Sequence, residues 1–395
     1  MRSLFTLLFG LLLATVASAQ QSSHVFILML ENRSDDQAMR YMPYLAGLTD
    51  QYGRGLQAYS PSHGSFNAYL EVVAGSHPVN GESDNGNCNG DNCQHPYTQD
   101  NMVRELNASH MTWRGYFQSM PLQGFMGYTY GDYVKRHNPY AYLSDVVNDH
   151  DQQGNMYPWD DNFAADLASG NVANYTWLVP DLTHDGHNPG GDDETALHNA
   201  DRYLSEQLPA LLRSRYFQPG GDGVLLVSFD ESELQGDNSC SQNQPQGCGG
   251  HILFAVIGPL AKSTYQTSTH IMQNDMLRGT CELLGVSSCP GDGAQAAGIA
   301  ELFQAQHLVV TITAPYNYYP DAGPATYLNA NAHSEYGPIT QWAVYVDGNL
   351  YAHANGSPTL QMWVSTSMGQ HVIEMKAWDG TGAMGSSEVH ITRTH

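Results

Sequence analysis

The stretch HVFILMLENRS, residues 24–34, decides the fold that we expect for this chain. Residues 25–30 are six consecutive large apolar side chains, which predict a strand buried on both faces of a parallel sheet. Glu31 and Asn32 follow at once, and open α/β sheets bind ligands just beyond the carboxyl ends of their strands. A carboxylate and an amide oxygen at such a place suit a hard cation. A lone Glu-Asn pair is more often an ordinary turn, so the prediction of a cation site depends on further residues elsewhere in the chain.

Three more apolar segments adjoin polar residues of the same kind. These are His184 and His187 after 175–179, Asp230 and Glu231 after 224–229, and His251 before 252–257. The alternation of such strands with helical segments predicts an α/β fold with a doubly wound, mostly parallel sheet. Taken singly, each polar group could be a solvated turn or a structural histidine. Four strand ends of like character are rarer by chance, so we interpret them as one site.

Ser65 stands at the start of a predicted helix. Apolar residues recur with helical spacing from Phe66 to Val73, and Gly75 is a natural end for the helix. Ser65 could simply cap this helix. As a nucleophile it would instead lie at the positive end of the helix dipole, where free backbone N–H groups can hold a phosphate. Its position alone leaves both interpretations open.

The net charge limits the classes of binding partner, and the first residues of the chain indicate where the protein is located. The chain has 15 Lys and Arg against 39 Asp and Glu, a net charge of −24, which argues against nucleic acid or an anionic membrane held by charge alone. Residues 1–19 have Arg2, an apolar run and a small-residue end, which predicts a signal peptide. No later apolar run is long enough to span a bilayer. We expect an exported, secreted or periplasmic protein without a transmembrane anchor.

The six cysteines form three local pairs. In an exported chain these predict three short-loop disulfides, although the sequence alone does not fix the connectivity. Zinc is the alternative, but no pair has the spacing of a Cys-x-x-Cys knuckle. The expected pairs are Cys88 with Cys93, Cys240 with Cys248, and Cys281 with Cys289.

The C-terminal part has a different pattern. Residues from 286 to 307 are rich in Gly and Ala, and alternating strand-like stretches with Asp-Gly turns follow from Leu308. They predict a small all-β sandwich of immunoglobulin-like length. We interpret this module either as a spacer or as a contact with a glycan or cell surface.

Together the polar groups predict metal-assisted chemistry. Three carboxylates and an amide favour one oxygen-liganded divalent ion, whose identity the sequence does not give. Histidines can bind phosphate oxygens or give a proton to a leaving group. A metal near Ser65 would lower the pKa of its hydroxyl and make it a nucleophile.

The motifs resemble those of a bacterial phosphoesterase family that includes acid phosphatases and phosphatidylcholine-type phospholipases C, within the alkaline-phosphatase-like superfold. Residues 24–34 resemble its hydrophobic strand followed by Glu-Asn-Arg-Ser, and 62–75 resemble its nucleophile segment. Residues 180–187 are similar to its Pro-Asp…His motif, and 227–251 contain its late Asp-Glu and Gly-Gly-His motifs. The motif order agrees from about residue 24 to 285. Three positions depart from the pattern: Asp35 replaces an aromatic residue, Gly64 replaces proline, and Asn67 is shifted by one because Ala68 stands where the asparagine usually falls.

The resemblance implies specific roles. Metal ligands would be Glu31, Asn32, Ser65, Asp230 and Glu231. Ser65 would also be the phosphorylated nucleophile, with His63, His187 and His251 binding phosphate or donating protons, and His184 and Asn67 contacting the substrate. The implied organisation is a signal peptide at 1–19, a phosphoesterase domain at 20–290, a linker at 291–307 and an immunoglobulin-like sandwich at 308–395.

The expected function is metal-dependent hydrolysis of phosphoesters, most simply of monoesters. A phospholipase C or phosphodiesterase is the alternative within enzymes, since the aromatic segment 120–159 could grip a choline-like head group, although such a segment can also be a cap packed on itself. The substrate would be a phosphorylated small molecule or lipid head group. A third interpretation is a non-catalytic exported binding or adhesion protein. The intact pairs Glu31-Asn32 and Asp230-Glu231 argue against it, because a binding protein does not need both.

Overall fold

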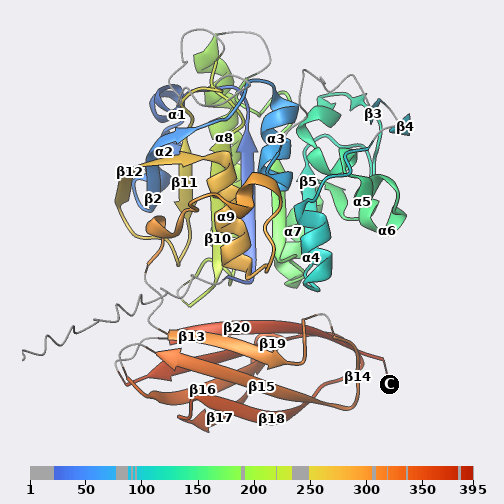
Figure 1. Ribbon diagram of the computed structural model, residues 1–395, viewed down its shortest axis with the longest axis vertical. Coiled ribbons are helices and arrows are strands. Elements are labelled where there is room, and N and C mark those ends of the chain that lie inside the picture. Colours follow the sequence, from blue (N-terminus) through green and yellow to red (C-terminus); the bar gives the residue numbers. More distant parts are fainter. Residues whose placement is uncertain are drawn as a thin grey trace, which may run out of the picture.

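The computed structural model describes residues 22–76, 96–187, 192–218, 220–233, 249–304, 308–317, 319–334, 337–380 and 384–394, together with the backbone of 88–89 and 92–93. An eight-stranded sheet in the order β12-β2-β11-β10-β1-β9-β5-β8 organises the N-terminal part (Figure 1). Its strands are β1 (His24–Leu30), β2 (Gly53–Tyr59), β5 (Trp113–Phe117), β8 (Met156–Pro158), β9 (Tyr175–Val179), β10 (Gly223–Phe229), β11 (Phe254–Ile257) and β12 (Tyr265–Met272).

The predicted doubly wound, mostly parallel sheet is confirmed. β1 lies parallel between β9 and β10, and β5 lies parallel between β9 and β8. Every residue of β1 and of β10 is buried, as their unbroken apolar runs require. Among these eight strands only β11 opposes its neighbours, β10 and β2. The carboxyl ends of β1, β2, β9 and β10 and the amino end of β11 therefore share one edge of the sheet.

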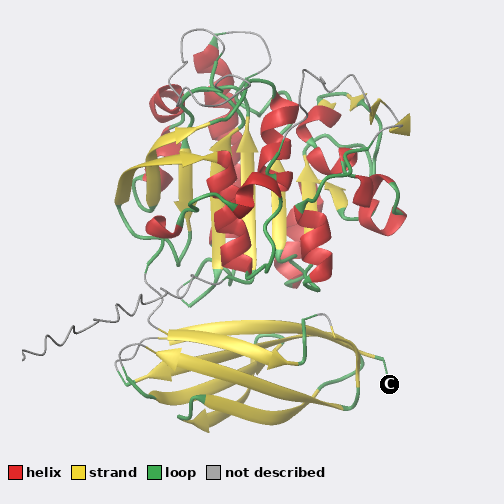
Figure 2. Ribbon diagram, in the orientation of Figure 1, coloured by secondary structure: helices red, strands yellow, loops and turns green. Residues whose placement is uncertain are grey.

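Helices cover both faces of this sheet (Figure 2). In one layer α3 (Ser65–Ala74) packs against α9 (Gln273–Leu284) and α4 (Met102–Ala108). In the other, α8 (Asp193–Leu212) packs against three helices: α1 (Asp35–Tyr41), α2 (Pro43–Thr49) and α7 (Asp160–Ser169). Shorter elements complete the domain: β3 (Cys88–Asn89), β4 (Asn92–Cys93), β6 (Thr129–Tyr130), β7 (Tyr133–Val134), α5 (Ser144–Val147), α6 (His150–Gln153) and the 3₁₀ turns η1 (Lys135–His137), η2 (Pro139–Tyr142), η3 (Gly291–Ala294) and η4 (Ala300–Leu302).

The C-terminal part is a β-sandwich, as predicted, with sheets β13-β15-β18 and β14-β20-β19-β16-β17. A shared apolar core that includes Leu328, Trp342 and Met375 joins the two sheets. The strands are β13 (Leu308–Ala314), β14 (Tyr319–Ala322), β15 (Ala325–Ser334), β16 (Ile339–Val346), β17 (Asn349–Asn355), β18 (Thr359–Ser365), β19 (Gly369–Asp379) and β20 (Met384–Arg393).

The structure adds detail that the sequence patterns did not predict. β2, β8 and β12 are three extra strands of the large sheet. Within 291–307, the expected linker, Ile299, Leu302 and Phe303 belong to the core of the α/β domain. The predicted disulfide between Cys281 and Cys289 is present.

Other predictions fall on residues outside the description. The signal peptide at 1–19 is one of them. The predicted disulfide of Cys240 with Cys248 lies wholly outside the described residues, so it stays a prediction. The predicted disulfide of Cys88 with Cys93 also stays a prediction, because only the backbone of these two residues is described; they are directly opposite each other in the pairing of β3 with β4.

No helix among the described residues has the length and apolarity needed to cross a membrane.

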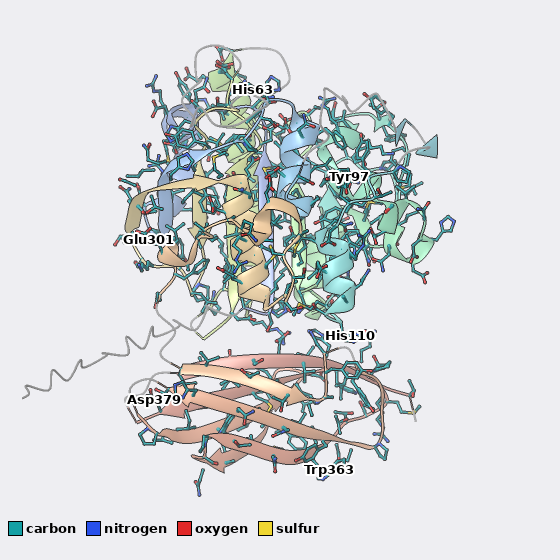
Figure 3. All side chains as sticks on the ribbon, viewed as in Figure 1. His63, Tyr97, His110, Glu301, Trp363 and Asp379 are labelled. Atoms are coloured by element: carbon teal, nitrogen blue, oxygen red, sulfur yellow. A yellow bond between two sulfur atoms is a disulfide. The ribbon has the colours of Figure 1, made fainter. Side chains whose placement is uncertain are left out.

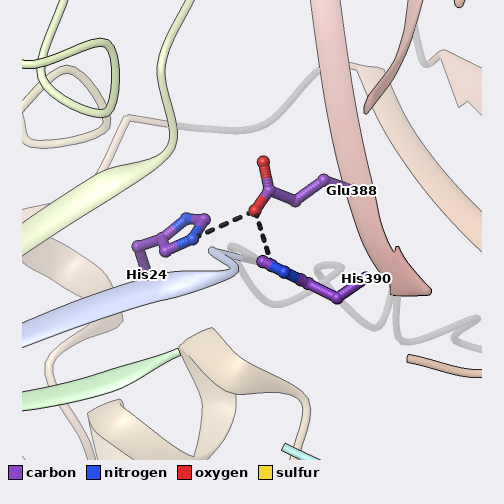
Figure 4. A group of neighbouring side chains, drawn as sticks. All are labelled: His24, Glu388 and His390. Atoms are coloured by element: carbon purple, nitrogen blue, oxygen red, sulfur yellow. Dashed lines mark hydrogen bonds and ion pairs between the residues drawn. The ribbon is translucent and has the colours of Figure 1, made fainter. Parts of the chain in front are cut away.

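His24, the first residue of β1, joins the two domains. Its imidazole is fully buried; Nδ1 lies 3.0 Å from Asp222 of the α/β domain, and Nε2 lies 3.0 Å from Glu388 of β20. His390 contacts the same Glu388 oxygen at 3.1 Å (Figure 4). Burial lowers the pKa of His24, but Asp222 and Glu388 outweigh it, so that this pKa lies well above its usual value. His24 is therefore a buried imidazole held between two carboxylates, which favour its protonated form.

Candidate active site

The candidate site lies at the sheet edge where β1 and β10 end. Glu31 directly follows β1, and Asp230 directly follows β10. Because these strands are parallel neighbours in register, with Leu30 opposite Phe229, both carboxylates reach the same place. Figure 3 shows His63, from the loop after β2, at the end of the α/β domain that faces away from the sandwich. The site and His24 thus occupy opposite ends of β1.

Asn32 links the predicted metal ligands to one another. Its backbone has φ +47°, a left-handed conformation that asparagine tolerates better than most residues. In this conformation its N–H donates to Asp230 Oδ1 at 2.7 Å, and its Nδ2 donates to Glu231 Oε1 at 3.2 Å. The Glu231 N–H also donates to Asp230 Oδ1, at 2.7 Å. Local backbone geometry therefore holds Asn32, Asp230 and Glu231 in one constellation.

Ser65 is the first residue of α3, and Gly64 is its N-cap. Gly64 has φ +102°, which proline cannot adopt because its ring fixes φ near −65°. The loop before Ser65 consequently differs in conformation from one that carries proline at this position. The Ser65 hydroxyl donates to Glu31 Oε2 at 2.9 Å, which places the predicted nucleophile beside the carboxylate cluster.

His63 also belongs to this constellation. Its Nδ1 lies 2.5 Å from Glu231 Oε2, and its side chain is partly exposed while that of Glu231 is buried. The buried carboxylate orients the partly exposed ring.

The electrostatics of the carboxylates fit a bound cation. Burial and the neighbouring Asp230 and Asp185 raise the pKa of Glu31 well above its usual value. Burial and Glu231 raise the pKa of Asp230 to about 7. Asp230 Oδ2 is buried and receives no hydrogen bond from any described residue. Like charges converge here around an unsatisfied oxygen, an arrangement that an oxygen-liganded divalent ion would neutralise. The donor set therefore fits the predicted metal.

Two other predicted residues, His187 and His251, contact Asp185 and the backbone of β2, respectively. The His187 N–H donates to Asp185 Oδ1 at 2.8 Å, and partial burial and Arg33 lower the pKa of His187. His251 Nε2 contacts the Leu56 carbonyl at 3.0 Å, a bond that ties the segment before β11 to β2, and the role of His251 at the site stays a prediction.

Neither His184 nor Asn67 has a described contact with the carboxylates. His184 stacks on Tyr203, with ring centroids 4.6 Å apart, and its Nδ1 lies 3.1 Å from Asp181. Asn67 lies in the first turn of α3, where its N–H donates to the Gly64 carbonyl at 3.0 Å and its Oδ1 is buried. The substrate-binding roles of both residues stay predictions.

Sequence reasoning missed three residues of the site. His137 is buried, with Nε2 3.2 Å from Glu31 Oε1, and its ring stacks on Tyr69 at an interplanar angle of 4°. Burial lowers its pKa well below the usual value, which favours the neutral imidazole. Gln273, at the start of α9, donates to the Phe229 and Asp230 carbonyls at 3.1 and 2.7 Å and fixes the end of β10. The third residue is Asp185: burial, Asp230 and the charge of Asp185 together raise the pKa of Glu31. Of the three, only Asp185 could have been found from the sequence, because it lies among the polar residues that follow β9.

Comparison with known proteins now identifies the family. A model of the Phosphoesterase family matches residues 39–280, more than half of the chain. The chain belongs to the phosphoesterase family. The predicted resemblance is thereby confirmed.

Curated relatives of this phosphoesterase include fungal acid phosphatases. It is 29% identical over 148 residues to a probable acid phosphatase of Kluyveromyces lactis, which covers 36% of this chain and 33% of that one. It is 22% identical over 232 residues to a phosphatidylinositol-3-phosphatase of Mycobacterium tuberculosis, covering 56% and 66%. The matches to the fungal enzymes thus span about a third of their length. Among solved structures, an alkaline phosphatase superfamily protein from Vibrio parahaemolyticus has a TM-score of 0.47, with 13% identity over 94% of this chain and 84% of that one.

Proposed function

We propose that this phosphoesterase is an exported, metal-dependent phosphomonoesterase of the acid phosphatase type, with Ser65 as its nucleophile. The observation that carries the proposal is the meeting of Ser65 with Glu31 and the carboxylates after β10, at the amino terminus of α3. Family membership and the fungal acid phosphatases support the reaction class. The pattern of residues 1–19 supports export.

The proposed reaction has two displacements at phosphorus. Ser65 Oγ attacks, its bond to phosphorus forms as the ester oxygen leaves, and the hydroxyl proton passes to Glu31, which already accepts it in a hydrogen bond. His63, oriented by Glu231, would bind a phosphate oxygen or protonate the leaving oxygen. Water then attacks phosphorus, the bond between Ser65 Oγ and phosphorus breaks, Oγ takes back the proton held by Glu31, and inorganic phosphate leaves.

A divalent ion would be held by Glu31, Asn32, Asp230 and Glu231, with the Ser65 hydroxyl as a further ligand. When bound, it would lower the pKa of that hydroxyl and offset the charge of the phosphoryl group. A cation at the site matters for substrate binding because the chain carries a net charge of −24, which repels anionic substrates.

Part of the aromatic segment supports the monoesterase over a phospholipase C. Tyr133, Tyr140, Tyr142 and Trp159 are buried in the α/β core and pack against other rings, as in a self-packed cap, whereas Tyr130 is exposed. A choline-binding cage needs such rings to face a ligand.

The test is phosphate release from p-nitrophenyl phosphate by wild type, Ser65→Ala and Ser263→Ala, each with and without chelator. Ser263 is exposed and precedes β12, whose Tyr265 pairs with Gly53 at the amino end of β2, the sheet end opposite to the site, so its variant is a matched control. We expect chelator-sensitive turnover in wild type and in the control, and a loss of about 10³-fold or more in Ser65→Ala. Full activity of Ser65→Ala would exclude this nucleophile, and chelator-resistant turnover would exclude the metal.

A further inference from the structure

The sandwich has one sheet face with an unusual set of exposed side chains. In the sheet β13-β15-β18, buried and exposed positions alternate along β15 and β18, so that one set fills the core and the other faces outward. We call the outward set the outer face. Its exposed or partly exposed members are Val309, Thr311, Thr313, Ala325, Tyr327, Asn329, Asn331, His333, Thr359, Gln361, Trp363 and Ser365.

Two aromatic rings form the largest exposed surface of the outer face. Tyr327 and Trp363 are directly opposite each other in the pairing of β15 with β18, and their ring centroids lie 5.3 Å apart. Trp363 is 64% exposed and Tyr327 is 37% exposed, whereas Trp342 of the same sandwich is fully buried. Tyr351, 42% exposed, adjoins the pair because its hydroxyl accepts from the Ser365 N–H at 3.1 Å. Clustered exposed rings of this kind mark an interaction site.

A row of uncharged polar groups continues from the aromatic pair along the same strands. Asn329 lies opposite Gln361, and Asn331 lies opposite Thr359, whose hydroxyl donates to Asn331 Oδ1 at 2.9 Å. Amide and hydroxyl groups both donate and accept hydrogen bonds, so they match a ligand rich in hydroxyls. The outer face thus combines ring surfaces for stacking with neutral hydrogen-bonding groups.

The charge of the outer face selects among partners. None of its members is Asp, Glu, Lys or Arg, although the whole chain has a net charge of −24. A nucleic acid or an anionic membrane would need a basic surface. A partner complementary to this face is itself uncharged, polar and able to cover aromatic rings with apolar C–H groups.

We propose that the outer face binds a neutral, β-linked polysaccharide. The pyranose rings of such a chain have C–H faces that would stack on Trp363 and Tyr327, while their hydroxyls would bond with the amide row. An extended β-linked chain is flat enough to lie along a sheet. Trp363 lies on the side of the sandwich that faces away from the α/β domain (Figure 3), so a bound glycan would leave the candidate active site open. The proposal is independent of the chemistry at that site.

The test uses the full chain and four neutral probes: insoluble cellulose and chitin in sedimentation, and soluble hydroxyethyl cellulose and β-1,3-glucan in affinity electrophoresis. The variants are Trp363→Ala, the double variant with Tyr327→Ala, and Tyr316→Ala as an exposed tyrosine outside the outer face. We expect wild type and Tyr316→Ala to bind at least one probe. Trp363→Ala should bind it about tenfold or more weakly, and the double variant should not bind it.

Thermal unfolding by circular dichroism shows whether each variant is folded, and size-exclusion chromatography gives its oligomeric state. Both Trp363 and Tyr327 are exposed, so the variants should melt as wild type does. Failure of wild type to bind any of the four probes would overturn the proposal, as would undiminished binding by the double variant. Self-association of wild type that Trp363→Ala abolishes would assign the outer face to a second copy of the chain instead.

Discussion

Asp230 is a residue of the candidate site whose buried charge is only partly compensated by hydrogen bonds. It is fully buried, accepts the backbone N–H groups of Asn32 and Glu231 on one oxygen, and leaves the other oxygen without a donor among the described residues. Its carboxyl is therefore costly to ionise unless a cation is present.

This cost predicts how the stability of the metal-free protein depends on pH. The folded pKa of Asp230, about 7, exceeds the value near 3.9 of an unfolded chain. The folded protein holds this proton between the two values, so the contribution to stability is full below about pH 4 and is lost as pH rises through 7. We expect the free energy of unfolding of chelator-treated protein to fall between pH 5 and pH 8, as measured by urea unfolding.

Two comparisons isolate Asp230 in that experiment. Asp230→Asn should flatten the fall, whereas Asp36→Asn, which changes an exposed aspartate of α1, should not. Added Mn²⁺ or Zn²⁺ should restore more stability at pH 8 than at pH 5, because the ion competes with the proton. A pH-independent wild type without metal would contradict this account.

Among the elements of the large sheet, the fully buried strands were predicted from the sequence, whereas the partly exposed β2 and β12 were not. β1 and β10 were predicted because all their residues are buried and most are apolar, with continuous apolar runs at 25–30 and 224–227. β2 has two glycines and an arginine among seven residues, and β12 has exposed polar side chains, so neither shows a strand pattern. The carboxylates of the site follow predicted strands and were therefore found.

His137 and Gln273 escaped prediction for a different reason. His137 lies in the 3₁₀ turn η1, where no periodicity marks it, and only tertiary packing brings it to Glu31. Gln273 occupies the first turn of α9, where a polar residue is ordinary. Its importance arises from the two carbonyls of β10 that it contacts.

Gln273 yields a prediction about α9 as a support for β10. Gln273→Met leaves the Phe229 and Asp230 carbonyls without this donor and frees the end of the strand. We expect metal affinity to fall about 10- to 100-fold, as for residues that orient metal ligands, and stability to fall by about 1–3 kcal/mol. Competition with a chromophoric chelator measures the affinity.

The matched control is Gln218→Met. Gln218 also donates to a backbone carbonyl, that of Leu212, but on the exposed surface. Its variant should leave metal affinity unchanged. Equal affinities in Gln273→Met and wild type would show that α9 does not position Asp230.

At the scale of the whole molecule, β1 connects the domain junction to the candidate site. His24 and Glu31 stand at its two ends, about 23 Å apart at the usual rise of a strand. The sandwich consequently docks at the opposite end of the sheet from the predicted chemistry, where it can add binding without covering the substrate path.

The junction predicts a second pH dependence. His24 and His390 outweigh burial and hold the pKa of Glu388 well below its usual value, while the pKa of His24 is raised. The stabilisation from His24 is full below about pH 6.5 and is lost above its raised pKa; that from Glu388 is lost as pH falls below about 4.5. Glu388→Gln should lower stability by about 3 kcal/mol near pH 6, and by less at pH 3 and pH 10, as followed by calorimetry.

Glu206→Gln, which changes an exposed glutamate of α8, is the control and should have little effect at any of these pH values. Equal losses for Glu388→Gln at pH 3, 6 and 10 would mean that packing, rather than charge, accounts for the role of Glu388.

The most direct test of the central claim is to trap the phosphorylated protein. Wild type would be mixed with ³²P-labelled p-nitrophenyl phosphate, quenched in acid within one turnover, digested and mapped by mass spectrometry. We predict phosphate on Ser65 in wild type, none in Ser65→Ala, and loss of the label when chelator precedes the substrate. Turnover with no label on Ser65, or label on another residue, would contradict the account.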